Sequence, residues 1–314
     1  MSGTRKLRTG VVGVGYFGRF HALKLARHPR VVLVGISDPD PLRLVDIASE
    51  CGTQAYTDHR ELIGMVDAVS IAAPARLHGV LAREFLAAGI HVLVEKPLAP
   101  SYAEAETLVR IARDQDLVLQ VGHQERAVLA AAGLFDIHDT PRAIDSVRKG
   151  PFTGRGTDVD VILDLMTHDL DMVHALNPSA IAMVKATGGR RRSDHLDEVE
   201  TTLTLKDGAI VHIVASRVAE ARERRMRIDY ACGHIAVDFL TRTVENTTPY
   251  VLGDLFPAGE SQVSVAGDPL GFAIDRFIAA ALGEGKPLVS GEEAAFTLMA
   301  GELIAKAAAE KAMT

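Results

Sequence analysis

The sequence has very few cysteines, only Cys51 and Cys232 among 314 residues. These two lie far apart in the chain and match no metal-binding or redox spacing, so a disulfide framework is not expected. A reducing compartment is therefore the expected environment. The opening stretch, MSGTRKLRT, is basic but lacks the apolar segment of a signal peptide, and we expect a cytoplasmic protein.

Long apolar runs and an excess of basic charge are also missing. No uninterrupted apolar segment is long enough to span a membrane, so no membrane partner is expected. The chain has 34 Lys and Arg against 41 Asp and Glu, and its basic residues form no stripe. Nucleic acid is therefore not an expected partner. We interpret the densest basic run, Arg190 to Arg192, as a solvated loop, with a phosphate site as the alternative.

The length and composition favour two globular domains. Apolar residues make up 47% of the chain and charged residues 24%, which is typical of a well-packed core. The length suits two domains of ordinary size. Because no low-complexity linker occurs, we expect a tight junction near Gly122.

The first part of the chain alternates strand and helix patterns. The strand patterns cover residues 7–13, 31–38, 68–74, 91–95 and 117–121, and the helix patterns cover residues 17–28, 41–51, 77–88 and 103–113. Near-continuous apolar strands between amphipathic helices predict a parallel sheet covered on both faces. Right-handed crossovers then produce the doubly wound Rossmann arrangement.

After Gly122 the pattern changes. Helices are predicted over residues 126–135 and 164–176, and two more close the chain over residues 272–282 and 292–311. Between them, residues 201–205, 210–216, 226–230 and 235–239 alternate apolar and polar side chains, with turn residues at 206–208 and 232–233. This half is predicted to be an α+β domain with a mainly antiparallel open sheet.

Three glycines with GxGxxG spacing lie where the first strand meets the first helix. Gly13 permits the tight turn, Gly15 lets backbone N–H groups approach a pyrophosphate, and Gly18 lets the helix pack closely on the strand. Tyr16 and Phe17 lie inside the turn and are also candidate cofactor-binding residues. The alternative is a structural turn that binds nothing.

Asp38 follows Gly18 by 20 residues, at the end of the second predicted strand. A carboxylate at this place accepts hydrogen bonds from the adenosine ribose and repels a 2′-phosphate, which favours NAD. Arg43 lies nearby and leaves NADP open.

Further motifs follow in order, and with the glycine turn they resemble the glucose–fructose oxidoreductase / inositol 2-dehydrogenase / rhizopine-catabolism (Gfo/Idh/MocA) family of sugar dehydrogenases. The motifs are Ala73-Pro74-x-x-x-His78, Ala88-Gly89-x-His91-Val92-x-x-Glu95-Lys96-Pro97 and Asp164-x-x-x-His168-Asp169. The resemblance covers nearly the whole chain. It implies an NAD-binding Rossmann domain over residues 1–122. Residues 123–314 would bind the substrate and form homodimers or homotetramers through the open sheet.

Lys96 is the first candidate catalytic residue. The resemblance implies that it lies between the nicotinamide and the substrate hydroxyl, and that the Lys96–Pro97 bond is cis. The residues point the same way, because Lys96 ends a predicted parallel strand, where ligands of this fold bind. A desolvated lysine can also exchange protons. The alternative is an exposed surface lysine. Glu95 could orient Lys96 or form an ion pair elsewhere.

Asp164 and His168 lie four residues apart on a predicted helix and so share one face. Oxidation of a secondary alcohol requires a base, and histidine suits that role near neutral pH. Asp164 could bind a substrate hydroxyl or tune His168. Alternatively, Asp164 caps the helix and His168 is a buried structural histidine. A metal site that includes Asp171 is a third reading, but the family chemistry needs no metal.

Four more residues are candidates near the site. Pro74 and His78 are interpreted as cofactor-adjacent, with a structural role for His78 as the alternative. The stretch GHQER, residues 122–126, resembles relatives that oxidise UDP-N-acetylglucosamine-type sugars at C3, which makes His123 and Arg126 candidate substrate contacts. Ala-Val-Leu follows where Phe-Asn-Pro is usual, and this departure weakens the nucleotide-sugar assignment. Arg126 could instead form a salt bridge.

The predicted function is reversible hydride transfer between nicotinamide and a secondary alcohol of a sugar, nucleotide sugar or polyol. Lys96 and His168 would handle the hydroxyl proton, and Asp164 would position it. An NAD-dependent glycosidase that oxidises C3 transiently is an alternative, and a non-catalytic NAD sensor is another. Such a sensor would be expected to lack the lysine or the histidine. Candidate specificity residues of the second half are Arg155, Asp160 and Arg217.

Overall fold

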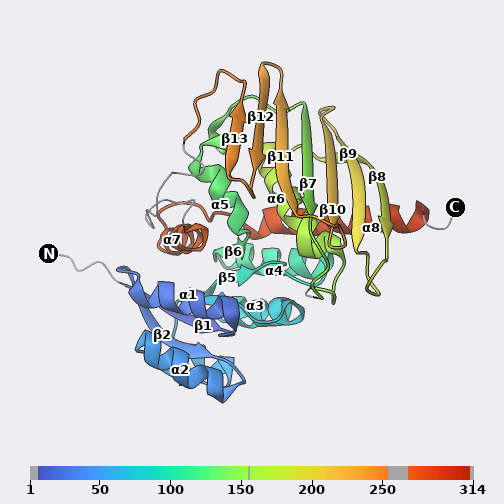
Figure 1. Cartoon of the computed structure of the whole chain (residues 1–314). Helices are drawn as coiled ribbons and strands as arrows, with labels where there is room; N and C mark the ends of the chain where they lie inside the picture. The colour runs from blue at the N-terminus through green and yellow to red at the C-terminus, as the bar shows by residue number, and fades with distance from the viewer. Residues whose placement is uncertain (1–5, 155, 254–267, 312–314) are drawn as a thin grey trace. The chain divides into compact units, whose positions relative to one another are not determined.

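The computed structural model describes residues 6–154, 156–253 and 268–311 (Figure 1). It divides into two compact units. The first is Met1–Ala127 with Asp268–Ala295, and the second is Val128–Gly267 with Phe296–Thr314.

The first unit contains a six-stranded parallel sheet in the order β3-β2-β1-β4-β5-β6. Its strands are β1 (Leu7–Val12), β2 (Val31–Ser37), β3 (Gln54–Tyr56), β4 (Ala68–Ile71), β5 (His91–Glu95) and β6 (Leu119–Gly122). Its helices are α1 (Tyr16–Arg27), α2 (Pro41–Cys51), α3 (His78–Ala87), α4 (Tyr102–Asp114) and α7 (Pro269–Ala281), with short 3-10 helices at His59–Leu62 and Ala75–Leu77. This strand order is that of the doubly wound dinucleotide-binding fold, as predicted.

Local sequence explains the helix ends of this unit. Asp40 caps α2 by accepting a hydrogen bond from the Leu42 N–H at 3.0 Å, and Pro41 occupies the first turn. Gly52 ends the helix in the left-handed conformation, with φ of 63°. The short edge strand β3 was not among the predicted strands, because its three residues are mostly exposed and carry no apolar alternation.

Helix α7 lies late in the chain but packs in the first unit. Its buried apolar residues join one core with residues of β1, α1 and β2: Leu270, Ile274, Phe277 and Ile278 with Leu7, Val11, Leu25 and Ile36. The Gln120 side chain of β6 donates to the Ala273 carbonyl at 2.7 Å. The sequence had suggested two consecutive domains, whereas residues 268–295 return to the first unit because α7 completes its core.

The second unit contains a seven-stranded sheet in the order β13-β12-β11-β7-β10-β9-β8. Its strands are β7 (Ala143–Lys149), β8 (Ile181–Gly189), β9 (Glu198–Leu205), β10 (Ile210–Ser216), β11 (Glu223–Tyr230), β12 (Gly233–Asp238) and β13 (Thr243–Asn246). Neighbours pair antiparallel except β7 and β10, which are parallel. Both predicted hairpins are present, the first with its turn at 206–208 and the second with its turn at residues 231–232, one residue earlier than predicted, because Gly233 of β12 already pairs with Tyr230. Strands β7, β8 and β13 were missed.

Helices cover one face of this second sheet. Helix α6 (Thr167–Leu176) and the later turns of α8 (Gly291–Lys311) contribute Leu170, Val173, Ile304 and other residues to a core with the inward side chains of the strands. The other face carries no helix from the described residues of this unit (Figure 1).

Two predicted helices of this half differ from the structure. The helix expected over residues 126–135 is α5 (Gln124–Ala131) followed by a 3-10 turn, Leu134–Asp136, because Gly133 adopts φ of 72° and interrupts it. The helix expected over residues 164–176 begins as a π-helical turn, Ile162–Met166, and becomes α-helical only from Thr167.

Candidate active site

The glycine turn connects β1 to α1, as its spacing predicted. A side chain would be tolerated differently at each of its three glycines. Gly13 has φ of 83°, and a Cβ there would lie 2.8 Å from the Ala72 carbonyl. A Cβ on Gly18 would lie 1.9 Å from the Gly13 carbonyl oxygen. A Cβ on Gly15 would meet nothing within 4 Å, so the space beside this backbone is open. That open space at the start of α1 fits an approaching pyrophosphate.

Asp38 lies beside this turn, just after β2, and is only 5% exposed. One carboxylate oxygen accepts from the Val14 N–H at 2.9 Å, and the other accepts from the Asp40 N–H at 3.0 Å. The carboxylate is thus fixed next to the turn, where an adenosine ribose would lie. Arg43 pairs with Asp40 at 3.1 Å. The residues present therefore fit NAD.

The two aromatic side chains of the turn face outward. Tyr16 is 78% exposed and Phe17 is 57% exposed. Tyr16 meets Phe17 and Phe20 edge to face, with ring centroids 5.3 and 5.4 Å apart. These rings form an exposed apolar surface at the start of α1.

The carboxyl ends of β4 and β5 are joined through His78. One ring nitrogen lies 2.8 Å from the Ala73 carbonyl oxygen, and the other lies 2.7 Å from the Pro97 carbonyl oxygen. His78 is buried and thereby fastens the segment that carries Lys96 to the segment that carries Pro74. The Lys96–Pro97 bond is cis, as expected. Lys96 itself is half-buried.

Glu95 belongs to a buried network that the sequence analysis missed. His21 on α1 lies 2.7 Å from the Ser70 hydroxyl and 3.0 Å from the Glu95 carboxylate. The Gln124 amide donates to the same carboxylate oxygen at 3.3 Å. A Cβ on Gly122 would lie 2.7 Å from that oxygen, so the absent side chain makes room for Glu95.

The electrostatics of this network favour an ionised Glu95. Burial raises the pKa of the Glu95 carboxyl, but hydrogen bonds from His21 and Gln124 and the nearby charges of His21 and His78 outweigh it, so the pKa lies below its ordinary value. Ser70 and His21 are fully buried. The Ser70–His21–Glu95 series therefore cannot serve as a nucleophilic triad, because no substrate reaches the hydroxyl. It holds an anion immediately before Lys96. The one signal that could have identified His21 is its place on the inward stripe of α1, with Gly18 and Leu25.

His123 and Arg126 are both buried in the first unit. The Arg126 guanidinium pairs with the Glu293 carboxylate and lies 3.5 Å from the Leu288 carbonyl oxygen. The structure thus places Arg126 in a salt bridge, which was the alternative to a substrate contact.

Asp164 and His168 belong to the second unit. Asp164 lies on the π-helical turn and His168 on the first turn of α6, and both are half-buried. Single π-helical turns occur frequently at functional sites. The next residue, Asp169, is buried and binds Arg148 at 2.9 Å and the Ser146 hydroxyl at 2.8 Å, which ties α6 to β7. Asp169 therefore has a structural role that orients the helix carrying His168.

The remaining polar candidates of the second unit have other partners. The side chains of Arg190, Arg191 and Arg192 are exposed, as a solvated loop predicts. Asp160 accepts from the Leu196 N–H at 2.8 Å, and Arg217 is buried against Asp197. Arg155 lies outside the described residues. No group of three or more His, Cys, Asp or Glu in the described ranges is arranged to hold a metal ion. Nor is any helix of those ranges long and apolar enough to cross a membrane.

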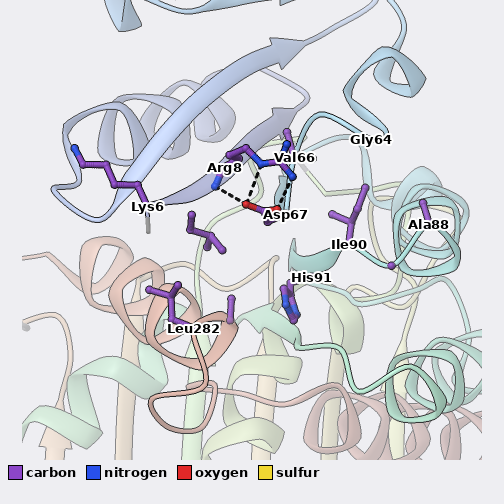
Figure 2. A pocket seen from close by; sticks show the side chains of 12 residues that line it. Lys6, Arg8, Gly64, Val66, Asp67, Ala88, Ile90, His91 and Leu282 are labelled. Atoms are coloured by element: carbon purple, nitrogen blue, oxygen red, sulfur yellow. Dashed lines mark hydrogen bonds and ion pairs between the residues drawn. The ribbon is translucent and has the colours of Figure 1, made fainter. Parts of the chain in front are cut away.

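A pocket of about 510 Å³ lies elsewhere in the first unit (Figure 2). Its lining includes Leu7 and His91, which begin β1 and β5, together with Arg8, Asp67 and Leu282. It therefore opens at the amino ends of the strands, whereas the glycine turn and Lys96 follow their carboxyl ends. Ligands of doubly wound sheets bind at the carboxyl ends, so this pocket is not the cofactor site. Within this pocket the Arg8 guanidinium forms an ion pair with the Asp67 carboxylate, at an N–O distance of 2.6 Å.

A doubly wound sheet with this turn and carboxylate is typical of NAD-binding proteins. Residues 7–123 match the oxidoreductase family with an NAD-binding Rossmann fold, and residues 138–236 match the Gfo/Idh/MocA C-terminal domain. The chain belongs to the Gfo/Idh/MocA family.

Three known proteins illustrate the similarity. The chain is 37% identical over 243 residues to the UDP-N-acetylglucosamine 3-dehydrogenase of Acidithiobacillus ferrooxidans, covering 76% of each protein. A solved structure of that enzyme matches with a TM-score of 0.85 at 33% identity, covering 96% of this chain and 97% of the other. The myo-inositol 2-dehydrogenase of Thermotoga maritima is 26% identical, covering 97% of each.

Proposed function

We propose that this protein is an NAD-dependent dehydrogenase that oxidises a secondary alcohol of a nucleotide sugar, most simply at C3 of a UDP-N-acetylhexosamine. The main observation in support of the reaction class is that the glycine turn, Asp38 and Lys96 all lie at the carboxyl ends of strands of one sheet, namely β1, β2 and β5. The 37% identity to a UDP-N-acetylglucosamine 3-dehydrogenase supports the substrate class.

The roles follow from the chemistry of each group. When bound, NAD supplies the hydride acceptor. The glycine turn holds the pyrophosphate and Asp38 the ribose, with Tyr16, Phe17, Pro74 and His78 nearby. Lys96, preceded by the anionic Glu95, exchanges the proton of the reacting hydroxyl together with His168, and Asp164 orients that hydroxyl. The first unit would thus bind the cofactor. The second would bind the substrate.

The proposal is tested by substrate and by variant. The wild-type protein with NAD and UDP-N-acetylglucosamine should accumulate NADH, whereas free glucose and myo-inositol should produce much less. Lys96→Ala should lower kcat by roughly 10²- to 10⁴-fold, the usual contribution of a positioned acid or base, while NAD binding persists. Lys286→Ala, which changes an exposed lysine of the same unit, is the matched control.

Two results would contradict the proposal. Full turnover by Lys96→Ala would remove the assigned role of the lysine. Cleavage of a glycoside without net NADH would instead identify the glycosidase alternative, because that reaction returns its hydride.

We further propose a homodimer or homotetramer formed through the helix-free face of the second sheet. Outward residues of this face include Val147, Val214 and His212, and His212 lies 2.9 Å from the Glu200 carboxylate. Antiparallel sheets can present one face to a partner. Val214→Arg should then lower the mass measured by light scattering, whereas Arg110→Glu on α4 should leave it unchanged. We also infer a cytoplasmic location, because both cysteines are free thiols.

A further inference from the structure

A buried ion pair in the second unit, Asp197 with Arg217, lies between two loops, residues 156–160 before Asp164 and residues 190–197 after β8. Asp197 has no exposed surface and Arg217 is 5% exposed. The Arg217 Nε donates to the Asp197 carboxylate at 2.8 Å. A buried pair of this kind is stable only when the remaining donors and acceptors are also satisfied. The other partners of these two residues show what the pair holds in place.

The Asp197 carboxylate organises the loop that follows β8. The backbone N–H groups of Arg191, Arg192 and Ser193 all donate to its Oδ2, at 2.7, 2.6 and 3.0 Å. The Ser193 hydroxyl donates to Oδ1 at 2.7 Å. Burial raises the pKa of the Asp197 carboxyl, but the Arg192 N–H, Arg217 and the other donors outweigh it and hold the pKa well below its usual range. The arginine run therefore serves this carboxylate through its backbone.

Arg217 connects the loop of residues 156–160 to the loop of residues 190–197. Its Nη1 donates to the carbonyl oxygens of Gly156 at 2.5 Å and Val159 at 2.9 Å, and its Nη2 donates to the Ser193 hydroxyl at 3.0 Å. The loops are also joined directly, since the Val161 N–H donates to the Leu196 carbonyl at 2.8 Å. One guanidinium thus spans both segments with its planar set of donors, which a lysine ammonium could not reproduce.

The loop of residues 156–160 lies directly against Asp164. Gly156 adopts φ of 66°, and a Cβ on it would lie 2.6 Å from the Asp164 Oδ2. At the other end of the loop, the Asp160 carbonyl accepts from the Asp164 N–H at 3.1 Å. The backbone that Arg217 holds is therefore the backbone that borders the Asp164 carboxylate.

We propose that Asp197 and Arg217 are positioning residues for the reaction: their ion pair holds residues 156–160 so that the Asp164 carboxylate keeps the orientation it needs toward the substrate hydroxyl. Neither residue contacts the reacting atoms in this scheme. The inference rests on the role of Asp164 in the proposed function.

The first test is independent of activity. In Arg217→Lys, backbone hydrogen exchange should rise in residues 156–164 and 190–197, while β11 and β12 keep their protection. Ile228→Val, a core change in β11, controls for a general loss of stability, and Arg191→Ala removes only an exposed ion pair with Glu198. If Arg217→Lys does not fold, Ser193→Ala removes one hydroxyl that contacts both charged partners. Unchanged exchange in both loops would overturn the proposal.

The second test asks whether the loss of activity in Arg217→Lys arises through Asp164. With UDP-N-acetylglucosamine and NAD, Arg217→Lys should lower kcat by about 10- to 100-fold, the scale of a small misplacement of reacting groups, and leave NAD affinity within about twofold of the wild type. The same change made in Asp164→Asn should have little further effect, because the group that it positions is already disabled.

The outcomes separate this inference from the proposed function. If Asp164→Asn is impaired and the two losses multiply, Arg217 does not act through Asp164 and the inference fails while the proposed function stands. If Asp164→Asn keeps full kcat, the assigned role of Asp164 fails, and the inference fails with it.

Discussion

The three glycines of the cofactor turn are required for different reasons. At only two of them would a side chain clash with the protein's own backbone. Gly13 and Gly18 avoid clashes with backbone atoms of Ala72 and of Gly13 itself. Gly15 avoids no clash within the protein. We therefore propose that its absent side chain is a requirement of the ligand, and substitutions can separate the two kinds of demand.

Gly15→Ala should fold with wild-type stability but bind NAD at least about tenfold more weakly, since its methyl group would occupy the space of the pyrophosphate. Gly18→Ala should instead destabilise the fold by about 1–3 kcal/mol or more, as overpacked sites do. Urea unfolding and titration calorimetry with NAD measure the two effects. Equal NAD affinity in Gly15→Ala and the wild type would show that the cofactor does not approach at this glycine.

His91 is a titrating group outside the proposed site. Burial lowers the pKa of its imidazole, partly offset by Asp67 and Asp116, and its Nδ1 accepts from the Val118 N–H at 2.9 Å. The unfolded chain, with a pKa of about 6.5, takes up the proton first as the pH falls. Stability should therefore be full above the unfolded pKa and decrease as the pH drops toward the lower folded value.

His91→Asn keeps an acceptor for the Val118 N–H but does not titrate. We expect the fall in urea midpoint between about pH 7.5 and about pH 5.5 to be smaller in this variant than in the wild type. Because the imidazole is partly exposed, the difference should be small. Identical pH dependence in the two proteins would contradict the assignment.

Among the elements, β7 shows why an alternating pattern can be missed. Its inward positions are Ile144, Ser146 and Arg148, and all three are buried. Ser146 and Arg148 are polar, and both bind the buried carboxylate of Asp169 on α6. The apolar alternation of a half-buried strand is therefore absent from the sequence, although the strand lies in the middle of the sheet.

Helix α7 carries an N-terminal cap that can be tested. Asp268 accepts from the Gly271 N–H at 2.9 Å and also pairs with Lys24 of α1. Asp268→Ala should cost about 0.5–2 kcal/mol of unfolding free energy, as lost caps do. Asp268→Asn should recover most of that loss, because asparagine caps equally well, and Lys24→Ala should remove only the ion pair. A greater loss in Lys24→Ala than in Asp268→Ala would show that the charge, not the cap, stabilises the helix.

At the scale of the whole molecule, the chain leaves the first unit after Ala127, returns to it over Asp268–Ala295 and then leaves it again. Helix α7 contributes four of the buried apolar residues of the core that surrounds β1. The first unit is therefore discontinuous in sequence, and its stability depends on a segment that follows most of the second unit.

This arrangement predicts how fragments behave. A fragment of residues 6–127 should unfold without a cooperative transition, because the apolar surface that α7 covers would be exposed. Joining residues 268–295 to it through a short glycine–serine linker should restore cooperative unfolding and NAD binding, measured by circular dichroism and calorimetry. A fragment of residues 6–127 that binds NAD with full affinity would show that α7 is dispensable.

The sequence by itself determined the features that depend on local chemistry. The glycine turn, Asp38, the doubly wound parallel class of the first sheet and the family follow from short motifs, because turns, caps and strand ends are specified by neighbouring residues, and the family resemblance in turn implied the cis bond before Pro97. What depends on distant partners was decided only by the tertiary structure. His21 meets Ser70 and Glu95 at separations of 49 and 74 residues. Arg217, a candidate specificity residue in the sequence, donates hydrogen bonds to the Asp197 carboxylate and the Gly156 carbonyl, at separations of 20 and 61 residues. A buried polar side chain needs hydrogen-bond partners, and in the folded protein these come from residues distant in the sequence. The residues next to it in the sequence therefore do not predict its partners.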